Sequence, residues 1–127
     1  MKGGSALGRV LGHGAARSGM AHWWQQRVTA IALIPLALWF VSALLAMPGF
    51  NYTQSAAWLA APWHAVLLCL LLATLCWHSS LGLQVVIEDY VHGPAAKTAC
   101  LLFVTFAHVL IAVAGIFAVL KVAFGTH

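Results

Sequence analysis

Long apolar stretches dominate the chain, and charged residues are confined to their ends. Between Arg27 and Glu88 there is no Lys, Arg, Asp or Glu. The same is true between Lys97 and Lys121. A helix needs about 20 apolar residues to cross roughly 30 Å of hydrocarbon, because it rises 1.5 Å per residue. The first gap therefore has room for two such helices and a loop, and the second has room for one.

This pattern predicts three transmembrane helices, at about residues 28–47, 63–87 and 98–124. Pro48 and Gly49, followed by polar residues 51–55, are expected to end the first helix. Pro62 precedes the second helix and suits a first helical turn. The breaker at residues 92–94 (His-Gly-Pro) separates the second helix from the third. A proline at position 35 predicts a kink in the first helix, which membrane helices tolerate.

The composition supports a membrane protein and excludes other classes. The chain is 63% hydrophobic and only 6% charged, whereas soluble domains carry about 25% charged residues. Such high hydrophobicity excludes a disordered chain, and three cysteines are too few for a disulfide scaffold. The sequence thus predicts an all-α integral membrane protein with an N-terminal cytoplasmic-side segment, residues 1–26, and a three-helix membrane domain, residues 27–127.

The basic residues predict the orientation of these helices. With the N-terminus inside, five basic residues lie inside and only Lys121 lies outside. The five are Lys2, Arg9, Arg17, Arg27 and Lys97. An excess of Lys and Arg marks the cytoplasmic side, so the N-terminus is expected inside and the C-terminus outside. The net charge of +4 is therefore a topology signal, and no nucleic-acid partner is expected.

Three histidines, His64, His78 and His108, fall within the predicted membrane helices. Ionisable residues at such depth face a bundle interior or a cavity. For His64, next to Trp63 at the outer interface, a hydrogen-bonded neutral imidazole is as good an interpretation as a ligand. His78 lies nine residues, about 14 Å, from Ile87 and hence near the membrane centre. A metal or haem iron is a natural partner for a neutral imidazole there.

The residues that follow His78 extend this candidate site toward the inner side. At about 100° per residue, Gly82 and Asp89 fall on the same side of the helix as His78. Gly82 leaves room for a flat macrocycle, although close helix packing explains a glycine equally well. Asp89 and Tyr90 stand at the hydrocarbon edge, where they can hydrogen-bond or exchange protons with a quinone. The alternative is an interfacial tyrosine beside solvated acids.

The segment HSSLGLQVVIEDY, residues 78–90, resembles the second helix of the small hydrophobic membrane anchor of succinate dehydrogenase, respiratory complex II. Residues 5–9 (SALGR) resemble the N-terminal segment of bacterial members, and residues 26–30 (QRVTA) resemble the start of their first helix. The resemblance implies a subunit of the bacterial inner membrane that takes part in electron transport and the tricarboxylic acid cycle.

The resemblance also implies a haem b shared with a larger cytochrome b anchor subunit. His78 is then one axial ligand of the haem iron, and a histidine of the partner subunit is the other. Gly82 borders the same haem. Arg27 is expected at the inner edge of the first helix, near a haem propionate or the quinone. His22 lies near the position of a propionate-contacting histidine of the family, with a spacing to Arg27 that is one residue shorter than in enterobacterial members.

For the quinone, the resemblance implies that Tyr90 donates a hydrogen bond to a carbonyl of ubiquinone and that Asp89 lies beside this site. Flavin, succinate and the iron–sulfur clusters belong to a flavoprotein subunit and an iron–sulfur subunit docked on the inner face. The chain itself has no dinucleotide-binding fingerprint and no clustered cysteines. It is therefore expected to be a non-flavin subunit of the enzyme that is not catalytic alone.

Two alternatives remain open from the sequence. One is a self-contained b-type cytochrome, because His108 reaches a depth similar to that of His78 and His64 lies nearly on the same helix face as His78. The other is a haem-free fumarate reductase anchor, in which His78 is only a packed histidine. The type of quinone, ubiquinone or menaquinone, and a trimeric assembly of the complex also stay open.

Overall fold

The structure, a computed structural model, describes the backbone of residues 15–125 and the side chains of residues 19–125. This part of the chain forms helices and no strands; the helices are α2 (Ala15–Leu45), α3 (Tyr52–Ala60), α4 (Pro62–Tyr90) and α5 (Pro94–Ala123). Three segments are long and apolar enough to cross a membrane: Gly19–Leu45, Pro62–Tyr90 and Pro94–Ala123. The prediction of an all-α membrane protein with three transmembrane helices is confirmed.

Two of the long helices begin earlier than expected. The first, α2, begins at Ala15 and not near residue 28, because polar side chains do not interrupt a helix whose backbone hydrogen bonds are internal. The third, α5, begins at Pro94 with Gly93 as its N-cap, so the proline expected to break the chain starts a helix instead. Proline is favoured in a first turn because the N–H it lacks has no partner there.

The short helix α3 stands where the sequence suggested only a polar loop. Its N-cap is Asn51, whose side-chain oxygen accepts a hydrogen bond from the Gln54 backbone N–H at 2.9 Å, a contact that stabilises a helix start. Ala56 is buried, and α3 contacts both α4 and α5. The helix therefore covers one end of the α4–α5 pair.

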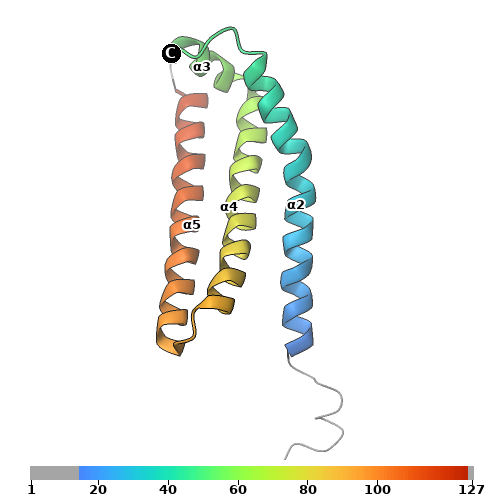
Figure 1. Ribbon diagram of the computed structural model, residues 1–127. Coiled ribbons are helices and arrows are strands. Elements are labelled where there is room, and N and C mark those ends of the chain that lie inside the picture. The colour runs from blue at the N-terminus through green and yellow to red at the C-terminus, as the bar shows by residue number, and fades with distance from the viewer. Residues whose placement is uncertain (1–14, 126–127) are drawn as a thin grey trace, which may run out of the picture.

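The three long helices form a row with α4 in the middle (Figure 1). Among the described residues, α4 contacts both α2 and α5, whereas α2 and α5 do not contact each other. Such a row encloses little core: the buried hydrophobic side chains are Ala56, Ala65, Leu71, Leu81 and Val119. Both faces of the α2–α4 pair consequently stay open to lipid or to another subunit.

The ends of the row agree with the distribution of charge. The start of α2 and the α4–α5 connection lie at one end, which we call the inner end, and α3 and the end of α5 lie at the other (Figure 1). Lys97 is thus at the inner end and Lys121 at the outer end. The orientation in the membrane stays a prediction.

The helix α2 continues through Pro35, and its upper part leans toward α4 (Figure 1).

Gly115 is a place where α5 comes close to α4. A Cβ atom at this position would lie 3.2 Å from Leu72 Cδ1. We expect Gly115→Val to force Leu72 aside and to lower the free energy of unfolding by about 1–3 kcal/mol, the usual effect of overpacking. Denaturant unfolding of the purified protein in detergent measures this change.

Gly19→Val is the matched control, because a Cβ at Gly19 meets nothing within 4 Å while the loss of a helical glycine is the same. The control should unfold close to the unmodified protein. Equal destabilisation by both variants would contradict close packing at Gly115.

Candidate functional site

Polar side chains meet between α2 and α4, in the middle of otherwise apolar helices. His22, Gln26 and Thr29 recur every three or four residues on α2, and His78 and Gly82 are four apart on α4, so each set shares one helix face. The Oγ1 atom of Thr29 lies 2.9 Å from Nδ1 of His78. The Nε2 atom of Gln26 lies 3.5 Å from Nε2 of His78. We call these five residues the α2–α4 polar cluster.

Thr29 is the most enclosed member of the cluster. It is only 4% exposed, and it is the single polar residue that is buried among the described side chains. Its hydroxyl oxygen also lies 2.8 Å from the Gln25 carbonyl and 3.1 Å from the Gln26 carbonyl. The side chain therefore joins the backbone of α2 to the imidazole on α4.

Two atoms of the cluster lack a hydrogen-bond partner. The Nε2 atom of His22 and the Oε1 atom of Gln26 are both buried and unpaired in the described part of the chain. A buried polar atom without a partner costs about 1–3 kcal/mol, and native structures contain few of them. The cluster thus has hydrogen-bonding capacity that the described residues do not use.

Gly82 is not required by the packing of α2 against α4. A Cβ atom at this position would meet only Gln26 Nε2, at 3.7 Å, which is an ordinary van der Waals contact. An alanine would therefore fit the isolated chain. This geometry weighs against close helix packing as the reason for the glycine and leaves the face next to His78 free of side-chain bulk.

Arg27 lies at the level of His78, since its neighbour Gln26 contacts His78. Its side chain is exposed, and its guanidinium stands over the Trp23 ring, 4.9 Å from the ring centroid. Because α2 begins at Ala15, Arg27 lies within the helix and not at its start, and its place near a haem propionate or the quinone stays a prediction. Arg27 therefore lies at the depth of the polar cluster, and Tyr90 lies about 18 Å further toward the inner end.

Asp89 and Tyr90 end α4 about 18 Å from His78 along the helix axis. Both side chains are exposed, Tyr90 to 77%, and the Tyr90 phenol makes no hydrogen bond within the described part of the chain. Next to them, the Lys97 ammonium donates to the Glu88 carbonyl at 2.9 Å, which ties the start of α5 to the end of α4. The chain leaves these two side chains available to another molecule.

The other two membrane histidines lie apart from the cluster. His64 has its Nδ1 2.8 Å from the Trp58 carbonyl and stacks on the Trp58 ring at 4.3 Å, at the outer end of α4. His108 has its Nδ1 2.8 Å from its own helix, at the Val104 carbonyl, and its Nε2 3.2 Å from Ser79 Oγ. His78 faces α2 and His108 contacts a different residue of α4, so the geometry does not favour a haem held by two histidines of this chain.

A comparison with known families identifies the kind of protein. The family model described as succinate dehydrogenase/fumarate reductase transmembrane subunit matches residues 1–115. The chain belongs to this family. The resemblance carried by residues 78–90 is thereby confirmed, and the three apolar helices fit a multi-pass protein of the inner membrane.

Individual relatives of the family are named as succinate dehydrogenase hydrophobic membrane anchor subunits. The protein from Rickettsia bellii is 35% identical over 84% of this chain and 85% of its own length. The protein from Rickettsia conorii is 35% identical over 61% of this chain and 63% of its own. The protein from Paracoccus denitrificans is 29% identical over 90% of this chain and 88% of its own.

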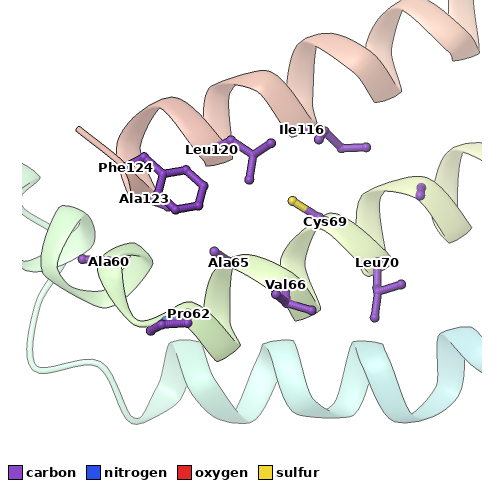
Figure 2. Close-up of a pocket in the computed structure, with 11 residues that line it drawn as sticks. Ala60, Pro62, Ala65, Val66, Cys69, Leu70, Ile116, Leu120, Ala123 and Phe124 are labelled. Atoms are coloured by element: carbon purple, nitrogen blue, oxygen red, sulfur yellow. The ribbon is translucent and has the colours of Figure 1, made fainter.

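Two apolar cavities lie on the α4–α5 side of this family member. One, of about 520 Å³, is at the outer end beneath α3, and Figure 2 shows the Cys69 sulfur pointing into it toward Leu120. It lies roughly 30 Å along α4 from Tyr90. The other, of about 440 Å³, is at the inner end. It is lined by Leu83, Ile87, Ala99, Cys100, Phe103 and Val104.

Sequence reasoning missed the parts that Gln26 and Thr29 play in the cluster. In the sequence, residues 26–30 stand out only by their similarity to the start of a family helix. The available signal was the spacing of His22, Gln26 and Thr29, which puts three polar side chains on one face of an apolar helix. Their contact with His78 could not be read from that spacing, since it depends on how α2 and α4 align.

Proposed function

We propose that the chain is the small membrane anchor of a succinate:quinone oxidoreductase. It fastens the flavoprotein and iron–sulfur subunits to the inner face of the membrane, binds haem b jointly with a larger cytochrome b anchor subunit, and forms one wall of the ubiquinone reduction site. Membership of the family supports the anchoring role. The α2–α4 polar cluster is the observation that carries the haem-binding role.

The residues of the cluster fit a haem. Nδ1 of His78 lies next to the Thr29 hydroxyl, and in the described part of the chain Nε2 has only the long contact with Gln26. Nε2 can therefore ligate iron. The unpaired His22 Nε2 and the exposed Arg27 guanidinium are suited to the haem propionates. A bound haem supplies a one-electron carrier whose potential depends on its axial ligands.

A second protein ligand for a bound haem would come from the partner anchor subunit. His64 and His108 are engaged at other places on α4. The row of helices leaves the α2–α4 pair open, so a second subunit can cover the cluster. A subunit bound there would also shield the unpaired atoms of His22 and Gln26 from lipid. This is energetically favourable only if the subunit gives these atoms hydrogen-bond partners.

The inner end of α4 is suited to quinone. Reduction of a quinone to a quinol takes up two protons, so the site needs groups that hold and deliver them. The Tyr90 phenol can donate a hydrogen bond to a quinone carbonyl, and the adjacent Asp89 carboxylate can carry a proton. The apolar cavity that includes Ile87 offers space for a hydrocarbon tail. The exposure of Tyr90 implies that other subunits complete the pocket.

We expect His78→Ala to abolish haem b binding, because an apolar side chain cannot ligate iron. The reduced-minus-oxidised difference spectrum of the purified complex should lack the haem b band. The matched control is His108→Ala, which removes an imidazole from the same membrane depth and should retain the band. In His78→Gly, added imidazole should restore it by filling the space of the lost ring.

Retention of the band in His78→Ala would contradict the ligand role. Loss of the band in both alanine variants would favour ligation within this chain. An unmodified complex without any haem band would instead favour a haem-free anchor.

We expect Tyr90→Phe to slow quinone reduction about tenfold, the effect of losing one hydrogen bond worth roughly 1.4 kcal/mol. The haem spectrum and succinate oxidation by a water-soluble dye should not change, because neither needs the phenol. Steady-state turnover with a short-chain ubiquinone measures the difference. The chain's other tyrosine provides the control: Tyr52→Phe, at the outer end, should behave as the unmodified complex. Normal turnover and normal quinone affinity in Tyr90→Phe would make Tyr90 an interface anchor only.

A further inference from the structure

We infer that Thr29 is a positioning residue for His78: its hydroxyl holds the imidazole proton on Nδ1 and so presents Nε2 to the haem iron. This inference rests on the proposed ligation of haem by His78. It assigns a role in haem binding to a residue of α2, which contributes no iron ligand itself.

The direction of the hydrogen bonds follows from the neighbours of the Thr29 hydroxyl. A hydroxyl has one hydrogen, and a carbonyl can only accept. The hydroxyl hydrogen therefore goes to the Gln25 carbonyl at 2.8 Å or the Gln26 carbonyl at 3.1 Å, a common arrangement for threonine in helices. Toward His78 the Thr29 oxygen can then only accept. In this arrangement the Nδ1 atom of His78, 2.9 Å away, carries the proton.

A neutral imidazole protonated at Nδ1 has its lone pair on Nε2. The contact of that atom with the Gln26 side chain, at 3.5 Å, is at the long limit for a hydrogen bond. The lone pair is therefore held only weakly in this chain and is available for a metal. Residues that bind the second nitrogen of a metal-ligating histidine fix its tautomer and ring orientation and raise its basicity, and their loss weakens metal binding about 10–100-fold.

The partner of Nδ1 distinguishes His78 from the other membrane histidines. In His64 and His108, Nδ1 lies within hydrogen-bond distance of a backbone carbonyl. A side-chain substitution does not remove a backbone carbonyl. His78 depends on a side chain from a different helix. Threonine suits this task because its β-branched side chain has few rotamers in a helix and because Thr29 is buried, where water cannot replace the hydroxyl.

Substitutions at Thr29 separate the hydroxyl from the shape of the side chain. Thr29→Val keeps the branched shape but removes the acceptor, whereas Thr29→Ser keeps the acceptor. The control is Thr105→Val, because Thr105 bonds its own helix in the same way, at 2.8 Å to the Leu101 carbonyl, but its side chain is exposed. All three are made in the intact complex.

Haem release to an excess of apomyoglobin and the haem midpoint potential are measured for each variant. We expect Thr29→Val to release haem about 10–100-fold faster and to have a higher midpoint potential, because a less basic imidazole stabilises ferric iron less. Thr29→Ser and Thr105→Val should match the unmodified complex. If Thr29→Val does not assemble, Thr29→Ser and Thr29→Ala, which differ by one oxygen atom, provide the same comparison.

Two results would overturn the inference and leave ligation by His78 intact. One is haem release and potential in Thr29→Val equal to those in Thr105→Val. The other is a Thr29→Ser variant as impaired as Thr29→Val, because packing and not the hydroxyl would then be responsible. Haem retained in His78→Ala would instead remove the proposed function itself, whatever the Thr29 variants do.

Discussion

An imidazole in the hydrocarbon of a membrane must have partners for both ring nitrogens, because lipid provides none. In His78 one ring nitrogen, Nδ1, has a partner in the Thr29 hydroxyl. The other ring nitrogen, Nε2, has among the described residues only the Gln26 side-chain amide as a neighbour, at 3.5 Å. Since unpaired polar groups are costly in such surroundings, the proposed ligand at Nε2 would stabilise the arrangement. The helices α2 and α4 are antiparallel (Figure 1). Their alignment brings the Thr29 and His78 side chains together.

The row of helices explains why the site is incomplete in one chain. A closed bundle of three helices would bury its polar side chains between them, whereas here, among the described residues, α5 contacts only α4 and α3. The α2–α4 pair keeps open faces, and the Tyr90 phenol projects from its inner end. Such a chain is suited to be half of a larger helical assembly. The proposed haem and the proposed quinone would then both lie at interfaces between subunits, the haem at mid-membrane and the quinone at the inner end of α4.

Much of this fold follows from the amino-acid pattern, because long charge-free stretches permit few structures other than membrane helices. The helix starts were less predictable. Polar residues before Arg27 continue α2, and Pro94 starts α5 where a break was expected. The helix α3 has a capping asparagine at position 51, but its apolar residues are too few to distinguish a helix from a loop. For the site, His78 and Gly82 were recognisable from spacing on one helix. The partner Thr29 was not, because pairing between helices depends on their alignment.

The position of the haem iron relative to His78 tests the central claim most directly. A structure of the intact complex, purified in mild detergent, measures it. The account predicts Nε2 of His78 at bonding distance from the iron, with Nδ1 still on the Thr29 hydroxyl and a histidine of a second subunit on the opposite face of the porphyrin. A His78 ring turned away from any porphyrin, or iron held by two residues of other chains, would contradict it.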